Sequence, residues 1–410
     1  MALIRPFRAI RPQRDKVHLV ATRPYYSYKK NVLKAKMEDN PYTFLHIINP
    51  EFNQKVSTKP NSKERFKLVK NRFNSFLKSG VLMKEKQPTL YLYRQHKDKH
   101  VFTGVIGGAS VAEYQNGLIK KHEATLTSRE EMFTSYLEEV GFNAEPVLLT
   151  YEGNDSINSI ISASTQERPE YEFTTTDHIK HEVWVLSQEH STQLQKAFER
   201  IPCTYIADGH HRCASSASLA ANRLNNGQDV LGAENFLAYF VEENNLSILA
   251  FNRLIRSLAG YSKATFLHSL AALGSVELLS EARTPLKEHE ICIYLEKEWY
   301  SLLLLDYLIE EDHAVNSLDS QMLTEFILKP LLGIEDLKTS DQVEFVPGNQ
   351  ELSVISASVD SGKFAIGFVL YPLSIEQVKK VADQQMNMPP KSTYVEPKLR
   401  SGLTNYDINE

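Results

Sequence analysis

The sequence predicts a mixed α/β (α+β) fold built from more than one subdomain, on three observations. Apolar runs of strand length alternate with segments of helical spacing along most of the chain. A chain of 410 residues exceeds what one ordinary core supports, so two or three subdomains are expected. A hydrophobic content of 42% is that of a folded globular protein.

The N-terminal half is expected to contain both helices and strands. Apolar residues on one face, including Phe66 and Phe73, predict a helix over residues 61–79, and Gly80 ends it. Residues 89–95 and 102–111 predict a hairpin whose glycines mark close packing or a bulge. The other expected elements are strands at 40–52, 146–151 and 181–187 and a helix at 191–201 with Ser191 as N-cap.

The C-terminal half predicts further strands and a second lobe. Residues 236–242 and 246–255 are expected to pair as a hairpin, and residues 301–308 read as the clearest later strand. We therefore expect a core over residues 1–255, a second α/β subdomain over 256–385, and a C-terminal loop over 386–410 that is a candidate to return to the active site.

Composition narrows the class of protein. A net charge of -5 argues against nucleic-acid binding, although residues 1–36 are rich in Arg and Lys, which suits an anionic small molecule as well as a polyanion. No apolar run approaches the roughly 20 residues of a membrane span, and the first ten residues lack the apolar core of a signal peptide. Three cysteines make no disulfide framework. We expect a cytoplasmic protein with reduced thiols, and the sequence leaves its oligomeric state open.

The most informative segment is TYIADGHHRCASS, residues 204–216. An apolar strand runs into Asp208-Gly209, and a run of small residues suited to a packed helix follows His210, His211 and Arg212. A helix N-terminus attracts anions through its free N–H groups and dipole. The segment predicts a phosphate or nucleotide site, and a structural Asp-Gly turn with solvated histidines is the alternative.

Two other segments carry candidate chemistry. His122-Glu123 follows two lysines, which keep the glutamate ionised and suit it to accept a proton from a hydroxyl; a solvated charged turn is the alternative. The stretch MPPKSTYVEPKLRSGL, residues 388–403, carries Lys391-Ser392-Thr393 on a proline-stiffened loop suited to phosphate, or else forms an ordered surface tail. Cysteine and histidine spacing does not match zinc, and Cys213 is expected to be a small core residue.

These segments together resemble the family known as domain of unknown function 1015. The resemblance rests on IRPFRAIRP, NPYTFLHIINPE, LYLYRQ, NGLIKKHEAT, PVLLTY, YIADGHHRCASS, ILAFNRLI and MPPKSTYVEPKLRSGL, in this order over nearly the whole chain. A more distant resemblance links the His-Glu element and the D-G-H-H-R turn to the ParB/sulfiredoxin-like fold, which includes kinases of free L-serine.

That second resemblance implies a kinase that transfers phosphate from ATP or ADP, with Mg²⁺, to a free amino acid such as L-serine. Glu123 would be the general base, His122 beside it would be a further catalytic residue, and Asp208 would hold the metal or position the substrate. Gly209, His210, His211 and Arg212 would bind the nucleotide phosphates, with Lys391, Ser392 and Thr393 as further contacts. The alternatives are a nucleotide-binding regulatory module without catalysis and a ParB-like nuclease or DNA-binding protein, which the net charge disfavours.

The chain departs from the family pattern at four positions. Tyr26 stands where relatives carry an acidic residue, and Phe133 and Tyr136 replace an Arg and a His after the His-Glu element. Asn252 replaces the histidine of a later His-Arg pair. These departures leave open whether activity and substrate are shared.

Overall fold

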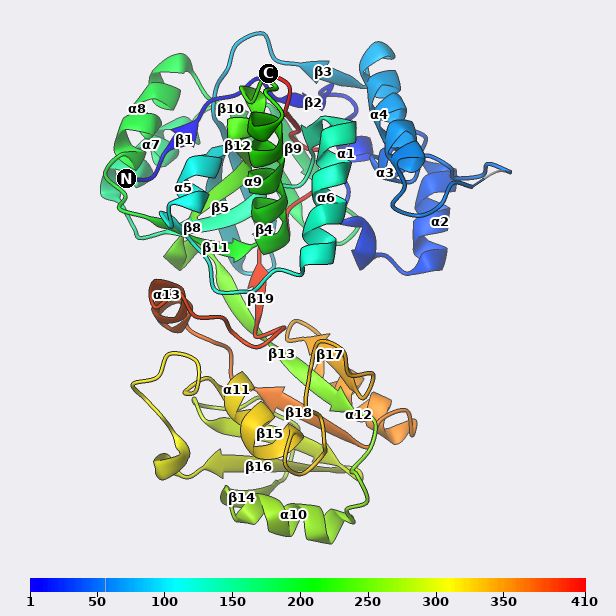
Figure 1. Ribbon diagram of the computed structural model, residues 1–410, viewed down its shortest axis with the longest axis vertical. Helices are drawn as coiled ribbons and strands as arrows, with labels where there is room; N and C mark the ends of the chain where they lie inside the picture. The colour runs from blue at the N-terminus through cyan, green and yellow to red at the C-terminus, as the bar shows by residue number, and fades with distance from the viewer. Residues whose placement is uncertain (56) are drawn as a thin grey trace. The chain divides into compact units, whose positions relative to one another are not determined.

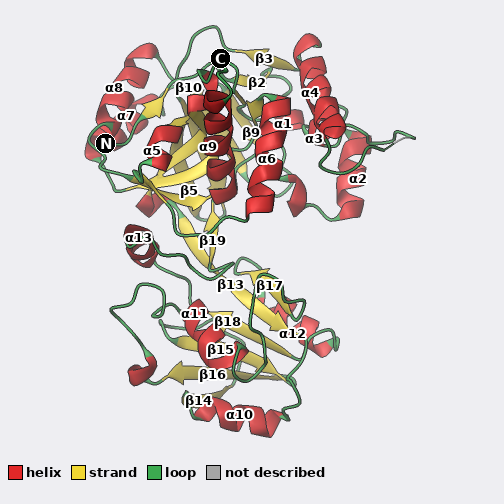
Figure 2. Ribbon diagram, viewed as in Figure 1, coloured by secondary structure: helices red, strands yellow, loops and turns green. Residues whose placement is uncertain are grey.

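The computed structural model describes residues 1–55 and 57–410, which divide into two compact units. The first unit contains residues 1–121, 125–246 and 397–410, and the second contains residues 122–124 and 247–396. Each unit has its own sheet and helices (Figures 1 and 2), which confirms the mixed α+β class. The segment expected as a C-terminal loop is divided between the two units after residue 396.

The first unit is built on a mixed sheet of nine strands among the described residues. Their order is β6-β11-β8-β12-β5-β4-β10-β9, and β1 pairs with β5. β11 runs antiparallel to β8 and parallel to β6, whereas β12 runs parallel to β8. The strands are β1 (Ile4–Arg5), β4 (Tyr91–Lys97), β5 (His100–Ser110), β6 (Ile119–Lys120), β8 (Val147–Tyr151), β9 (Tyr171–Thr174), β10 (Lys180–Val185), β11 (Thr204–Asp208) and β12 (Asn235–Glu242).

The expected hairpin over residues 89–111 is confirmed. β4 and β5 pair antiparallel, and Lys97 faces His100 across the turn. Two of the β5 glycines are needed for close packing: a Cβ at Gly104 would lie 2.4 Å from the backbone oxygen of Phe240, and one at Gly107 would lie 2.6 Å from the Ile4 side chain. The strands expected at 146–151 and 181–187 are present as β8 and β10.

Helices cover the first sheet, and α9 packs beside α6 in front of it (Figure 1). Small buried residues in α9, including Cys213 and Ala217, belong to the apolar core of this unit. The helices are α1 (Val17–Val20), α2 (Lys30–Asp39), α3 (Leu45–Ile48), α4 (Lys63–Lys78), α5 (Val111–Gln115), α6 (Thr127–Val140), α7 (Asp155–Ser164), α8 (Gln188–Phe198) and α9 (His210–Asn225), with short 3₁₀ turns at Tyr25–Ser27, Gly232–Glu234 and Glu243–Asn245. Helix α4 confirms the periodicity of residues 61–79, and Gly80 follows it with φ +71°.

Two local predictions in this unit are wrong. The expected strand at 40–52 contains the helical turn α3 instead, because the Asn40 side chain accepts a hydrogen bond from the N–H of Tyr42 and starts a turn that buries Leu45 and Ile47. The N-cap of α8 is Ser187, whose hydroxyl oxygen accepts the N–H of His190, whereas Ser191 lies inside the helix.

The second unit is built on a sheet in the order β14-β16-β15-β18-β13-β17, with β19 pairing with β13. Its strands are β13 (Ser247–Ile255), β14 (Gly274–Leu279), β15 (Glu290–Leu295), β16 (Glu298–Leu304), β17 (Val343–Pro347), β18 (Ile366–Leu370) and β19 (Thr393–Glu396). Its helices are α10 (Lys263–Ala271), α11 (Asp319–Leu323), which continues as a π-helix over Thr324–Leu328, α12 (Leu352–Asp360) and α13 (Ile375–Asp383), and a 3₁₀ turn spans Asp306–Leu308.

The hairpin expected between residues 236–242 and 246–255 does not form. β12 pairs on both sides inside the first sheet, with β5 and β8, and so has no free edge for β13. β13 pairs instead with β17, β18 and β19 of the second unit. The strand expected at 301–308 is β16, which begins earlier and ends at Leu304.

Shorter pairings complete the first unit. β2 (Ile10–Pro12) pairs with β3 (Leu82–Lys84), and β7 (Phe142–Asn143) pairs with β20 (Tyr406–Asp407). Among the described residues, no helix combines the length and apolarity that crossing a bilayer requires.

Candidate functional site

The D-G-H-H-R segment forms the corner between β11 and α9. β11 ends at Asp208, Gly209 has φ +111°, and α9 begins at His210. A Cβ at Gly209 would lie 3.0 Å from Nη2 of Arg212, so glycine serves both the backbone conformation and the close approach of this guanidinium. The strand-to-helix corner expected from the sequence is present.

Cations surround the carboxylate at the end of β11. Lys398 Nζ donates to Asp208 Oδ2 at 3.0 Å, and Arg212 Nη2 lies 3.8 Å from Oδ1. Burial raises the pKa of Asp208, but the charges of Lys398 and Arg212 outweigh burial and bring it to about 2. Arg212 Nη1 also donates to the backbone oxygen of Pro146, which fixes the guanidinium beside the turn. Asp208 is therefore an ionised carboxylate held between two cations at neutral pH.

A small pocket lies beside this corner. Its charged lining consists of Asp208, Arg212, Lys398 and Glu145, and Tyr26 adds an exposed aromatic ring. All of these residues belong to the first unit. The pocket thus combines two cations, two carboxylates and a ring suited to stacking.

The two histidines of the turn differ in environment. His210 is buried, with 5% of its surface exposed, and opens α9. His211 is half-buried, and burial together with the charge of Arg129 lowers its pKa, so its ring is neutral at pH 7. Its Nδ1 is buried and has no hydrogen-bond partner among the described residues. His211 thus offers a neutral ring nitrogen rather than a cation.

The His-Glu element lies in the second unit. Residues 122–124 cluster with that unit, where the N–H of Met388 donates to the backbone oxygen of His122 at 2.8 Å. Burial lowers the pKa of His122 to about 4, so this ring is neutral at pH 7, whereas Glu123 is exposed. The fold therefore joins the His-Glu element to the start of the MPPKST stretch. The pairing of Glu123 with the Asp208–Arg212 turn stays a prediction.

The three predicted phosphate contacts of the MPPKST stretch have unequal roles. Lys391 is exposed and adopts φ +58°. The Ser392 hydroxyl is buried; it donates to the backbone oxygen of Pro389 at 2.8 Å and lies 2.9 Å from the hydroxyl of Ser320. Thr393 begins β19 opposite Ala250. Because the Ser392 proton is engaged internally, Lys391 is the residue best placed to meet an anion.

The departures from the family pattern divide into pocket and core positions. Tyr26 lines the pocket beside Asp208. Tyr136 packs edge-on against Phe66 with ring centroids 5.2 Å apart. Asn252 is buried, and its side-chain oxygen accepts the N–H of Leu370. The changes at Tyr136 and Asn252 therefore serve packing and hydrogen bonding, and nothing in the described part of the chain explains Phe133.

Lys398 belongs to the site, although the sequence analysis assigned it no partner there. It was visible only as one of the cations after the MPPKST stretch, and its partner Asp208 is 190 residues away in the sequence. Two residues later, Arg400 forms a buried ion pair with Asp177 at 2.8 Å. The C-terminal segment thus reaches the D-G-H-H-R corner through Lys398 and is anchored by Arg400.

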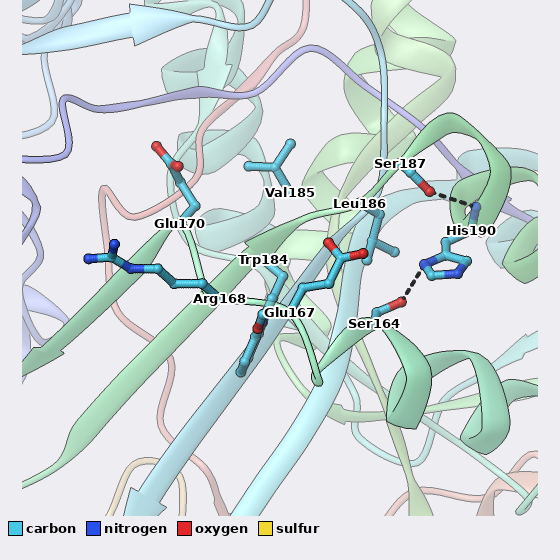
Figure 3. A pocket seen from close by; sticks show the side chains of 9 residues that line it. All are labelled: Ser164, Glu167, Arg168, Glu170, Trp184, Val185, Leu186, Ser187 and His190. Carbon is cyan, nitrogen blue, oxygen red and sulfur yellow. Dashed lines mark hydrogen bonds between the residues drawn. The ribbon is translucent and has the colours of Figure 1, made fainter.

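A second pocket of the first unit lies beside Trp184, and several polar groups that line it form hydrogen bonds with one another (Figure 3). The hydroxyl of Ser164 lies 2.8 Å from Nδ1 of His190, and the indole N–H of Trp184 donates to the backbone oxygen of Glu167. These contacts tie the end of α7 to the start of α8. The polar groups that line this pocket therefore stabilise the local structure, and they do not indicate a ligand.

Metal-binding geometry is not found in residues 1–55 and 57–410: no three His, Cys, Asp or Glu side chains gather as ligands. Cys213 is a buried core residue, and burial raises the pKa of its thiol. The prediction of a small core residue at this position is confirmed.

Comparisons with known proteins give one family match and several weak structural ones. The family described as "Protein of unknown function (DUF1015)" matches residues 4–321. No curated protein matches. Solved structures that match weakly include C-terminally truncated SbnI from Staphylococcus aureus, at 14% identity and TM-score 0.37 over 73% of this chain and 85% of that one.

Two further structures are similarly distant. A conserved hypothetical protein from Pyrococcus furiosus has 14% identity and TM-score 0.35 over 75% of this chain and 96% of that one. A free serine kinase in complex with AMP has 12% identity and TM-score 0.33 over 73% and 91%. At such scores these structures carry no argument about activity. The family match covers most of the chain, and the chain therefore belongs to the DUF1015 family.

Proposed function

We propose that this protein is a small-molecule kinase that transfers a phosphoryl group from ATP or ADP to the hydroxyl of a free amino acid, with L-serine as the leading acceptor and O-phospho-L-serine as product. The observation that carries the proposal is the β11–α9 corner, where Lys398 and Arg212 flank Asp208 at the start of a 16-residue helix. The ParB-like character of the core is part of the same proposal.

The corner supplies what phosphate binding needs. The first N–H groups of an α-helix have no intrahelical acceptor and lie at the positive end of the helix dipole. Gly209 keeps the backbone free of a side chain there, and Arg212 and Lys398 provide charge. His210 and His211 add ring nitrogens, and Tyr26 is suited to stack on a nucleotide base. Phosphoryl transfer depends chiefly on positioning and charge neutralisation, so such a cradle is chemically sufficient.

In the proposed reaction, Glu123 accepts the proton of the substrate hydroxyl. The hydroxyl oxygen forms a bond to the terminal phosphorus while the bond from that phosphorus to the bridging oxygen breaks, which leaves ADP from ATP or AMP from ADP. Exposure of Glu123 in the second unit is compatible with this role, and neutral His122 is a buried neighbour rather than an acid. Lys391 would add a cationic contact to phosphate.

Magnesium does not fit at Asp208 as first predicted. One of its oxygens accepts from Lys398 and the other faces Arg212, and a divalent cation would have to displace these charges. No step is therefore assigned to a metal held by Asp208, whose role is to position Lys398 and Arg212.

The test is incubation of the full chain with ATP or ADP, Mg²⁺ and L-serine, followed by detection of phosphoserine by mass spectrometry. Glu123→Gln should abolish turnover while calorimetry still shows nucleotide binding, because the phosphate cradle is intact. Arg212→Lys, which keeps the charge but loses the fork, should weaken nucleotide binding by about tenfold. Glu131→Gln, at an exposed glutamate on α6, is the control.

Three outcomes separate the alternatives. Phosphoserine formation that Glu123→Gln removes supports the kinase. Nucleotide binding with no product over a broad panel of hydroxyl substrates would leave the regulatory nucleotide-binding module as the function. Salt-dependent DNA binding without nucleotide binding would favour the ParB-like nuclease or DNA-binding alternative.

A further inference from the structure

The second unit contains a fully buried arginine without a counter-charge. Arg253 in β13 is 0% exposed, and among the described residues no carboxylate forms an ion pair with it. Its Nη1 donates to the backbone oxygen of Phe251, Nη2 donates to that of Lys391 at 3.2 Å, and its Nε has no hydrogen-bond partner. Burial alone lowers its pKa to about 9. At neutral pH the unit therefore holds an unbalanced positive charge beneath the loop of Lys391.

Lys391 adds a second cation at the same place. Its Nζ lies 5.1 Å from the ring centroid of Phe251, while Cζ of Arg253 lies 5.5 Å from that of Phe345. The two rings meet edge to face with centroids 6.4 Å apart. The charges thus lie along one aromatic pair, and no carboxylate in the described part of the chain forms an ion pair with either.

Both features are unfavourable without a further partner. Buried charges in proteins are normally paired, and an apolar residue of similar volume in place of a buried ion is often neutral or stabilising. A lysine at φ +58° also adopts a backbone conformation that strains an L-residue. The bond from Arg253 to the Lys391 carbonyl holds this loop conformation. An unpaired buried charge and a strained backbone conformation both disfavour folding, and proteins retain such features chiefly at functional positions.

We propose that the loop of residues 389–393 is an anion subsite for a phosphate group, in which Lys391 contacts the anion and Arg253 is the positioning residue that holds the loop and supplies positive potential from beneath it. The inference rests on the proposed phosphate-binding role of this loop and adds Arg253 to it. A dianionic phosphate supplies the negative charge that the two side chains lack. The Ser392 hydroxyl takes part only in holding the loop, through Pro389 and Ser320.

The experiment compares Arg253→Met, Lys391→Met and the control Arg256→Met, with inorganic phosphate and ADP as calorimetric probes at low ionic strength. Arg256 is a matched control because it is exposed in the same unit, donates to the backbone oxygen of Asp341 and lies over the ring of Phe364. Arg253→Met and Lys391→Met should each weaken phosphate binding by about tenfold or more, and Arg256→Met should not.

Thermal unfolding shows whether Arg253→Met loses phosphate binding because the fold is damaged or because the loop is no longer held in place. Arg253→Met should keep or raise the unfolding temperature, since it removes a buried unpaired charge; Lys391 is exposed, so Lys391→Met tests the site even if Arg253→Met fails to fold. Phosphate titrations are repeated in an Arg212→Lys background, where the contribution of the β11–α9 corner is reduced.

The outcomes distinguish this inference from the proposed kinase. If Arg253→Met and Lys391→Met bind phosphate as tightly as the unmodified protein, the proposed anion subsite is wrong. The proposed serine kinase activity would be unaffected by this result, because it is based on the β11–α9 corner. Absence of any phosphate binding by the unmodified protein also overturns it. Loss of phosphate binding in both variants supports the subsite even if no phosphoserine forms.

Discussion

Replacement of Gly209 by alanine tests the reasoning about the β11–α9 corner most directly. At φ +111° an L-residue is strained, and such backbone strain amounts to about 1–3 kcal/mol. The new Cβ would also lie 3.0–3.1 Å from three atoms of the Arg212 guanidinium, inside the ordinary contact distance of about 3.5–4.0 Å. The guanidinium must shift by a few tenths of an ångström, which disturbs its contacts with Asp208 and with the Pro146 carbonyl.

Gly209→Ala should therefore lower both stability and anion affinity. For a domain of this size each kcal/mol lowers the melting temperature by about 2–4 °C, so a fall of several degrees is expected in differential scanning calorimetry. Displacement of Arg212 should weaken ADP binding by about tenfold or more in isothermal titration calorimetry.

Gly227→Ala is the matched control. Gly227 follows the other end of α9, has φ +64°, and a Cβ there would meet no heavy atom within 4 Å. This variant should lose stability through its backbone alone and bind ADP like the unmodified protein. Unchanged ADP affinity in Gly209→Ala, or an equal loss in both variants, would refute the role assigned to the corner.

The remaining predictions concern charge and thiol chemistry. Lys398→Met should raise the pKa of Asp208. It should also weaken ADP binding several-fold, which is about what one surface-accessible charged contact contributes. Titration calorimetry with ADP between pH 4 and 8 would detect this loss of affinity. Burial raises the pKa of Asp177, but the hydrogen bond from Thr175 and the charge of Arg400 bring it to about 2, against an ordinary 3.8. The contacts of Asp177 with Thr175 and Arg400 together therefore stabilise the fold above about pH 4 by on the order of 2 kcal/mol, and this stability is lost as the pH falls through about 2. Arg400→Met should remove part of it at neutral pH in urea titrations and make little difference in strong acid. Cys203, which is partly exposed, should react with a thiol reagent in the native protein, and the two buried cysteines only after unfolding, as counted by absorbance.

Local patterns in the sequence predicted several elements whose signal was carried by neighbouring residues. The face of α4 and the β4–β5 hairpin were found because helical and alternating spacing arise from residues a few positions apart. The α3 turn was missed because a single Asn40 side chain decides between strand and turn over residues of mixed propensity. The supposed hairpin of β12 and β13 failed because sheet partners are chosen by distant strands.

The sequence by itself determined the family and the β11–α9 corner, because an Asp-Gly pair after an apolar strand and before a run of small residues specifies that turn locally. Tertiary structure alone decided that Lys398 is the partner of Asp208, and that Arg253 lies buried under Lys391 without a carboxylate. Such contacts join residues more than a hundred positions apart, and their energies depend on burial and on the charges that the fold brings together. Neither quantity is present in any short stretch of sequence.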